Sequence, residues 1–178
     1  IYCSDVSGAF DRVNAKRLIL KLKAKKIHES IIKVLTSWLR SRSANVVVGG
    51  EKSADIVLEN MVFQGTVWGP PLWNIFYEDA KRAIRELFFE ESVYADDFNA
   101  YRLFPSTTPN DKVWHCLKEC QNELHAWGRA NQVVFDATKE SKHILSRKQP
   151  YGEAFMLLGV SFDCKLLMSD TVLGFAKN

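Results

Sequence analysis

Two groups of acidic residues stand where predicted strands end, and their side chains could hold metal ions. Asp5 closes a short strand-like stretch that begins at Ile1, and the Asp96-Asp97 doublet lies at the tip of a predicted hairpin. If the first strand pairs beside this hairpin, three carboxylates converge and raise one another's pKa. A divalent cation relieves such repulsion, because Mg²⁺ prefers oxygen ligands and is commonly held by carboxylates plus substrate phosphates. Two such ions could activate an attacking oxygen and stabilise a leaving one during phosphoryl transfer.

An acidic doublet in a turn is also common for reasons unrelated to metals. Asp favours turns and helix caps because its short carboxylate accepts hydrogen bonds from nearby backbone amides. Neither Asp5 nor the doublet predicts a metal site by itself. The elements that position these residues, and the other motifs along the chain, have to decide between turn chemistry and catalysis.

The hydrophobic pattern predicts an α+β fold, in which helices pack on one face of the antiparallel sheet that carries the carboxylates. Strands are expected over residues 1–6, 92–94, 98–103, 132–135, 143–145 and 155–162, with a hairpin over 45–58 around Gly49-Gly50. Helices are expected over 14–26, 29–42 and 72–87, the last opened by Pro70-Pro71. A long helix should follow Thr108 as cap and Pro109 as its first residue. No composition shift divides the chain, so one domain is expected.

Composition limits the classes of binding partner without identifying one. Residues 1–43 contain ten Lys or Arg against three acidic residues, whereas the whole chain carries a net charge of only +3. This region could face phosphates, but its lysines do not form one stripe, so a solvated helix face explains them equally well. No apolar run reaches the length of a membrane span, and the four cysteines lack the paired spacing of structural zinc sites. A start at Ile1 without a leader pattern suggests a fragment.

Five ordered segments resemble the motifs of reverse transcriptases, and in particular those of non-LTR, LINE-like retrotransposons. Motifs A, B and C correspond to Asp5-Val-Ser-Gly-Ala-Phe-Asp11, Gln64-Gly-Thr-Val-Trp-Gly-Pro70-Pro-Leu-Trp-Asn74 and Tyr94-Ala-Asp-Asp97. Motifs D and E correspond to the stretch from Trp127 through Asp136 to Lys139, and to Leu157-Leu158-Gly159-Val160. The resemblance covers nearly the whole chain, and five motifs in order are far more specific than Tyr-Ala-Asp-Asp alone.

The resemblance implies a polymerase palm over residues 1–169, with fingers missing upstream, and the start of a thumb connection or a truncated tail over 170–178. The implied enzyme is an RNA-directed DNA polymerase that uses two Mg²⁺ ions, or Mn²⁺, to add dNTPs to a primer 3′-hydroxyl. Its partners would be an RNA template, a DNA primer and a dNTP, with no membrane. The parent protein would supply fingers, thumb and an endonuclease domain. An intracellular, nuclear location is a further implication of the family.

The family's catalytic and metal-binding roles fall on four acidic or basic side chains and one backbone carbonyl. Asp5 and Asp96 would bind both metal ions, with Asp97 in support and the carbonyl of Val6 at the second ion. Lys139 would be the motif D lysine near the leaving pyrophosphate, as a cation or proton donor. An ordinary surface lysine explains Lys139 about as well on sequence grounds.

Substrate roles follow from the same motifs. Phe10 stands where the family has an aromatic steric gate, whose ring would collide with a ribose 2′-hydroxyl and so favour dNTPs. Gln64 and Gly65 would line the nucleotide pocket, because Gly permits close backbone approach. A primer grip would be formed by Leu157, Leu158 and Gly159.

Several positions depart from the family pattern and leave alternatives open. Phe63 replaces a frequent Pro, Pro71 a Leu, Trp73 a Phe, and Glu140 a Thr or Ser. None of these changes removes a metal ligand, but the missing fingers predict weak activity for the chain alone. The alternatives are a catalytically inactive palm relic, acting as a nucleic-acid-binding or assembly module, and another palm-like phosphoryl transferase such as a nucleotide cyclase. An RNA-dependent RNA polymerase is disfavoured by the bulky Phe10.

Overall fold

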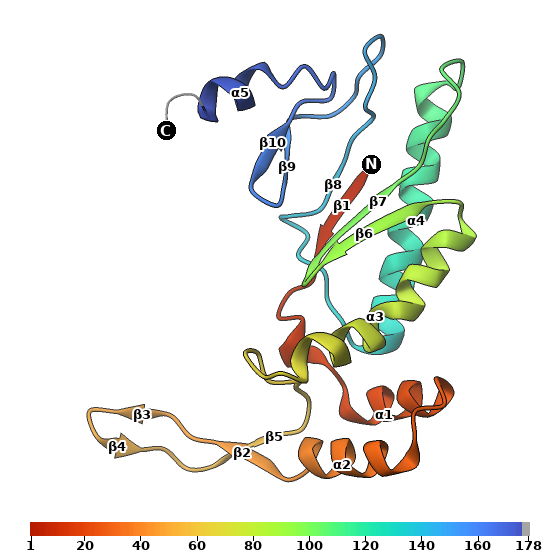
Figure 1. Cartoon of the computed structure of the whole chain (residues 1–178). Coiled ribbons are helices and arrows are strands. Elements are labelled where there is room, and N and C mark those ends of the chain that lie inside the picture. Colours follow the sequence, from red (N-terminus) through yellow and green to blue (C-terminus); the bar gives the residue numbers. More distant parts are fainter. Residues whose placement is uncertain (176–178) are drawn as a thin grey trace.

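A four-stranded antiparallel sheet organises the chain, which the computed structural model describes over residues 1–175 (Figure 1). The strand order is β6-β7-β1-β8, formed by β1 (Tyr2–Asp5), β6 (Glu90–Tyr94), β7 (Asp97–Tyr101) and β8 (Ser141–Lys142). The hairpin predicted around the acidic doublet is therefore present, and the first strand pairs directly beside it. The expected α+β fold with an antiparallel sheet is confirmed.

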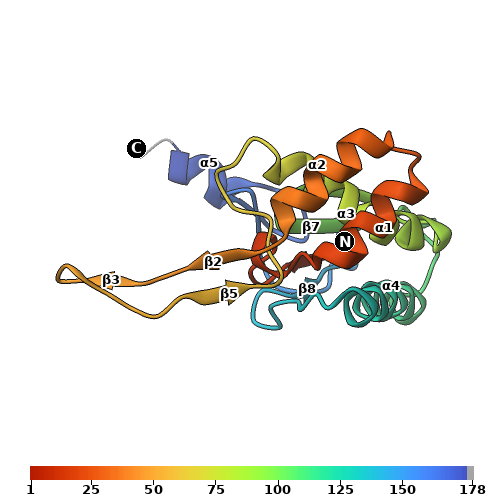
Figure 2. The ribbon, with the colours of Figure 1, turned by 90° about the horizontal axis from the view of Figure 1, so that it is seen from below.

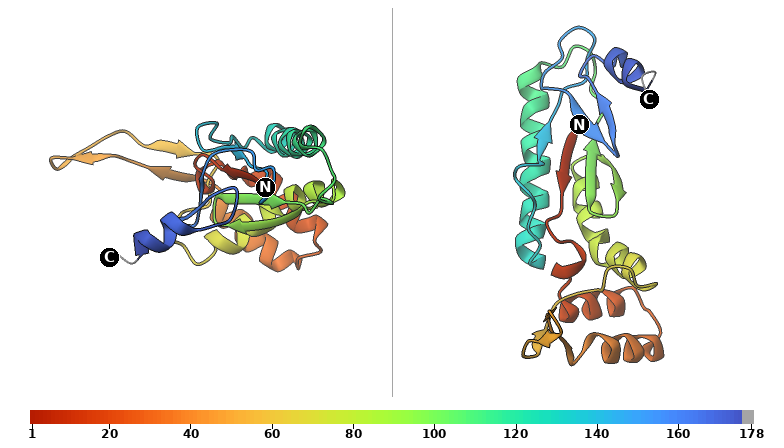
Figure 3. Two further views of the ribbon diagram at one scale, coloured as in Figure 1. Left: turned by 90° about the horizontal axis from the view of Figure 1, so that it is seen from above. Right: turned by 90° about the vertical axis from the view of Figure 1, so that its left-hand side faces the viewer.

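Helices cover one face of this sheet and leave the other open. Helix α3 (Gly69–Glu86) contacts β6, helix α4 (Asn110–Asn131) contacts β1, and the two helices pack against each other. Alternation along the strands turns Tyr2, Phe98 and Ala100 toward the helices, where all three are fully buried. Figure 3, right, shows α4 on one side of β1 and the hairpin of β9 (Phe155–Leu157) and β10 (Val160–Phe162) on the other.

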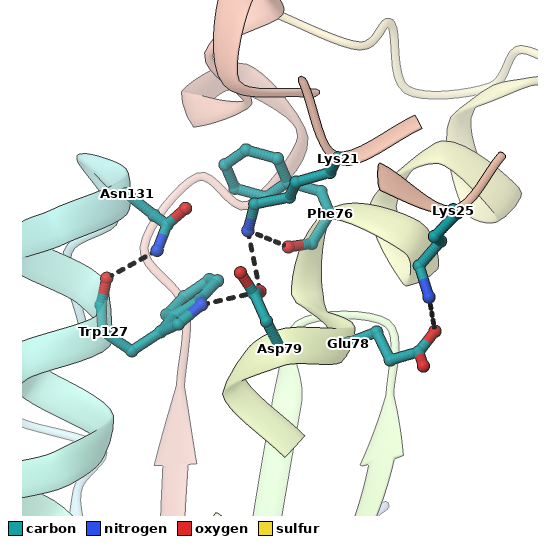
Figure 4. Close-up of polar contacts among 7 residues, drawn as sticks. All are labelled: Lys21, Lys25, Phe76, Glu78, Asp79, Trp127 and Asn131. Carbon is teal, nitrogen blue, oxygen red and sulfur yellow. Dashed lines mark hydrogen bonds and ion pairs between the residues drawn. The ribbon is translucent and has the colours of Figure 1, made fainter. Parts of the chain in front are cut away.

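A charged junction of Lys21, Asp79 and Trp127 joins three helices (Figure 4). The ammonium of Lys21 on α1 (Ala15–Ala24) donates to Asp79 at 2.7 Å and to the Phe76 carbonyl at 2.6 Å. The Trp127 indole of α4 donates to the same Asp79 oxygen at 2.8 Å. Burial lowers the pKa of Lys21, and Asp79 opposes that shift. One carboxylate on α3 thus joins three helices.

The segment between the second and third helices extends away from the body as a two-stranded ribbon (Figure 2). After α2 (Glu29–Leu39) the chain runs through β2 (Arg42–Ala44) and β3 (Val47–Val48), turns, and returns through β4 (Glu51–Lys52) and β5 (Ile56–Leu58). The turn needs the predicted Gly49-Gly50, because both glycines have positive φ, 60° and 89°. The expected hairpin is confirmed and is longer than its sequence signal.

Some predicted boundaries are wrong, and each for a local reason. Residues 132–135 and 143–145 do not form the predicted strands. Each stretch makes a single isolated bridge, Phe135 with Val6 and Ile144 with Tyr151. Helix α3 begins three residues before the predicted start, since prolines are accommodated in a first turn whose N–H groups have no partner. Helix α4 begins at Asn110, with Pro109 rather than Thr108 at the cap position.

The carboxyl-terminal boundary of the palm stays a prediction. Helix α5 (Ser169–Phe175) runs across the expected division at residue 170, and residues 176–178 of the expected tail lie outside the described part. Over residues 1–175, no helix combines the length and the apolar character needed to cross a membrane.

Asp79→Ala should lower the free energy of unfolding by about 1–3 kcal/mol, because it leaves the largely buried Lys21 ammonium and the Trp127 indole without their acceptor. Glu78→Ala is the matched control, since its pair with Lys25 is more exposed and should cost under about 1 kcal/mol. Urea unfolding of both variants compares the two losses. Equal losses would contradict the role given to the junction.

Candidate active site

Two carboxylates face each other across the central strand pair. In the β1–β7 register Asp5 lies directly opposite Asp97, and side chains at opposed positions project from the same face of a sheet. Because Tyr2 and Ser4 alternate with Asp5 and turn toward the helices, both aspartates belong to the open face. Asp5 is nevertheless only 8% exposed, with Lys139 donating to its Oδ2 and the Asp136 amide donating to its carbonyl.

The third carboxylate is on the turn that joins β6 to β7. Tyr94 pairs with Asp97, so Ala95 and Asp96 form a two-residue turn, and Ala95 has a left-handed φ of 52°. Both turn carbonyls are held from outside: the Val6 amide donates to Asp96 at 3.1 Å, and the Trp73 indole donates to Ala95 at 2.6 Å. The backbone of Asp96 is thereby fixed beside the end of β1, next to Asp5.

The electrostatics of this corner reflect crowded negative charge. Burial raises the pKa of Asp97, and the nearby Asp96 and Asp5 carboxylates raise it further, while Lys139 opposes the shift. The Lys139 ammonium donates to Asp5 Oδ2 at 2.9 Å, and this contact raises the pKa of Lys139. The sequence-predicted Lys139 is thus brought to the carboxylates, although its side chain remains 61% exposed.

The carboxylates are the kind of ligand that Mg²⁺ prefers, but they are not already arranged around a metal position. Within residues 1–175, no three His, Cys, Asp or Glu side chains are grouped as a bound metal ion requires. Carboxylate oxygens are the ligands Mg²⁺ prefers, and the raised pKa of Asp97 marks a place where added positive charge is favourable. One oxygen of Asp5 is engaged by the exposed Lys139 side chain. A cation there would require Lys139 to move aside.

Glu140, next to Lys139, is a buried carboxylate that the sequence marks only as a departure from the family pattern. Glu140 accepts hydrogen bonds from Tyr2 on β1 and from two α4 side chains, Gln121 at 3.0 Å and His125 at 2.6 Å. Burial raises the pKa of Glu140, but the bonds from His125 and Tyr2 outweigh it and hold that pKa below its usual value. The network fixes the chain beside Lys139, and no sequence spacing signals it.

Backbone pairing places Phe10 beside the segment that precedes Gln64 and Gly65. The Val62 amide donates to the Phe10 carbonyl at 2.8 Å, so η1 (Phe10–Arg12) lies beside the segment that leads into Gln64 and Gly65. Gly65 has a φ of 81° and open space where a Cβ would stand, while the Phe10 ring packs on Trp73 at a centroid distance of 5.9 Å. The backbone of Phe10 thus lies beside the segment that leads to Gln64 and Gly65, while its ring packs on Trp73.

The predicted primer grip lies across a cavity from the carboxylates. The cavity has a volume of about 400 Å³, and its lining includes Asp5, Asp97 and Lys139 on one side and Leu157 and Leu158 on the other. Leu158 and Gly159 both have positive φ, 48° and 81°, and form the tight turn between β9 and β10. Gly159 contributes the turn rather than the lining.

Comparisons with known proteins identify a family and a similar fold. The family described as "Reverse transcriptase (RNA-dependent DNA polymerase)" matches residues 1–160. A solved structure of apo telomerase from Candida tropicalis, truncated from the C-terminal domain, is similar with a TM-score of 0.60 and 18% identity. That match covers 93% of this chain but 34% of the telomerase chain, so this chain spans about a third of its length. At this identity the likeness concerns the fold alone. The comparison with curated proteins gave no significant match.

Asp97→Asn should raise the free energy of unfolding at pH 7, by up to about 1 kcal/mol, the scale of an unfavourable cross-strand pair. Because the folded-state pKa of Asp97 is raised, its ionisation destabilises the fold as pH rises through the carboxyl range. The advantage of the variant should therefore shrink as pH is lowered. Denaturant unfolding at several pH values measures it.

Asp163→Asn provides a control of opposite sign. Three backbone amides donate to Asp163 and lower its pKa, so this substitution should destabilise the chain at neutral pH. A loss of stability in Asp97→Asn that parallels the loss in Asp163→Asn would contradict the charge repulsion inferred at the active site.

Proposed function

Because the chain belongs to the reverse transcriptase family, we propose that its open sheet face carries out RNA-directed DNA synthesis by two-metal nucleotidyl transfer. One observation carries the proposal: the β1–β7 register sets Asp5 opposite Asp97, with Asp96 on the adjoining turn. Three carboxylates from two distant motifs are thereby gathered where they repel one another. A fold without need of cations would gain nothing from that repulsion.

In this proposal the three carboxylates would hold the metal ions, and Lys139 would interact with the leaving pyrophosphate. Asp5, Asp96 and the Val6 carbonyl would hold two Mg²⁺ ions, or Mn²⁺, with Asp97 in support. When bound, the ions lower the pKa of the primer 3′-hydroxyl and neutralise triphosphate charge. Lys139 neutralises Asp5 in the free chain and, once displaced by the ions, reaches the departing pyrophosphate as a cation or proton donor.

Substrate selection in this proposal falls to the corner built around Phe10. Its half-buried ring lies against the core side chain of Trp73, and its carbonyl accepts from the Val62 amide, two residues before Gln64. A dNTP sugar seated over that ring leaves no room for a 2′-hydroxyl. The open space beside Gly65 suits close approach of the nucleotide to the backbone.

The primer would enter through the cavity between the carboxylates and the β9–β10 hairpin. Apolar Leu157 and Leu158 there pack against sugar and base rather than phosphate, which suits a residue pair that positions a 3′ end. RNA template and DNA primer are the proposed partners. The Gln64-Gly65 and Gly69-Pro70 pairs support a non-LTR retrotransposon origin, for which nuclear action and accompanying fingers, thumb and endonuclease domains are the corresponding proposals.

Primer extension on an RNA template, with dNTPs and Mg²⁺ or Mn²⁺, tests the function. Asp96→Asn should reduce extension by about 10³-fold or more, because a lost metal ligand removes several kcal/mol of transition-state stabilisation. Asp111→Asn, at the exposed start of α4, is the matched control and should extend as the parent does. A parent that binds primed RNA but never extends it would favour the alternative, a non-catalytic nucleic-acid-binding or assembly module.

A further inference from the structure

We infer that Trp73 is a positioning residue for the catalytic turn: its indole N–H holds the Ala95 carbonyl and so fixes the backbone that carries Asp96 and Asp97. The inference rests on the proposed function, because it concerns how the carboxylates are kept ready for metal ions. Trp73 belongs to motif B and the turn to motif C, so this bond joins two functional segments 22 residues apart.

The turn needs an external anchor because its own backbone is strained. Ala95 has a φ of 52°, a left-handed value that glycine adopts freely and alanine does not. Such a conformation persists only where the surroundings over-determine it. Two bonds do so here: Val6 holds the Asp96 carbonyl from one side at 3.1 Å, and Trp73 holds the Ala95 carbonyl from the other at 2.6 Å.

The donor itself is rigid. Trp73 is 1% exposed and stacks on Tyr77, at a centroid distance of 5.1 Å and an interplanar angle of 24°. Tyr77 in turn packs edge-on against Phe98 of β7 and Trp127 of α4. The indole therefore cannot follow the turn if the turn relaxes, and its N–H acts as a fixed point in the core.

The same ring also contacts the proposed sugar gate. Phe10 lies 5.9 Å from Trp73 between ring centroids, with an interplanar angle of 42°. One side chain on α3 therefore sets the turn that carries the metal ligands and supports the ring that faces the sugar. A phenylalanine at this position would preserve much of the packing, but it has no N–H to donate. A substitution at position 73 can therefore remove the hydrogen bond while keeping most of the packing.

Trp73→Phe tests the bond, beside incorporation of benzothienylalanine at position 73, which keeps the shape of the indole but replaces its N–H with sulfur. The first readout is hydrogen exchange of the Val6 amide in the metal-free chain, because that amide bonds the neighbouring turn carbonyl. The second is the dissociation constant for Mn²⁺ as the probe ion. We expect faster Val6 exchange and Mn²⁺ binding weakened about three- to tenfold, the range of one net hydrogen bond.

Asp79→Ala is the matched control, because it also removes an indole hydrogen bond, the one that Trp127 donates at 2.8 Å, while the Trp127 ring stays in its packing against Tyr77. It should lower overall stability while leaving Mn²⁺ affinity unchanged and Val6 exchange unchanged relative to the amides of β7. Unaltered Val6 exchange in both position-73 variants, or equal effects of the Trp73 and Asp79 changes, would overturn the inference. A parent that binds no Mn²⁺ would refute the proposed metal site instead, and Val6 exchange alone would then decide on Trp73.

Discussion

The structure depends on one unfavourable pairing, that of Asp5 with Asp97 across adjacent strands. Opposed like charges destabilise a sheet, and here burial adds to the repulsion and raises the pKa of Asp97. The register cannot slip to relieve it, because a one-residue shift would turn the fully buried Tyr2 away from the helices. Lys139 offsets part of the charge from the open side. The packing of the core thus enforces the repulsion between the two carboxylates, and only added positive charge relieves it.

Contacts outside the three carboxylates hold the backbone that carries them in place. Trp73 and Val6 anchor the two carbonyls of the turn, and Glu140 fixes the chain beside Lys139 through bonds to β1 and α4. Farther away, Asp79 on α3 accepts from Lys21 on α1 and from Trp127 on α4, and so joins these three helices. Each contact contributes little alone, but together they hold the turn, the chain beside Lys139 and the three joined helices. This division, with a strained site on a well-tied scaffold, is common where function opposes stability.

The sequence predicted the elements of the site better than the contacts that hold them. Alternation and turn residues located β1, the β6–β7 hairpin and the Gly49-Gly50 turn, and motif order located the carboxylates. Periodicity reports which face a residue occupies but not which distant group it meets, so neither the Trp73–Ala95 bond nor the Glu140 network was foreseeable. The short apolar runs at 132–135 and 143–145 predict strands, but the structure has only single bridges there, because a single bridge and a longer strand share the same local pattern.

The central claim is that the β1–β7 register builds a cation site from Asp5, Asp96 and Asp97. A Mn²⁺ titration followed by paramagnetic broadening of backbone amide signals tests it most directly, because it locates the ion without requiring turnover. The account predicts that the amides of Val6 and of residues 95–97 broaden first, and that Asp5→Asn removes this effect. Broadening that begins at other acidic surfaces, or that persists unchanged in Asp5→Asn, would contradict the account.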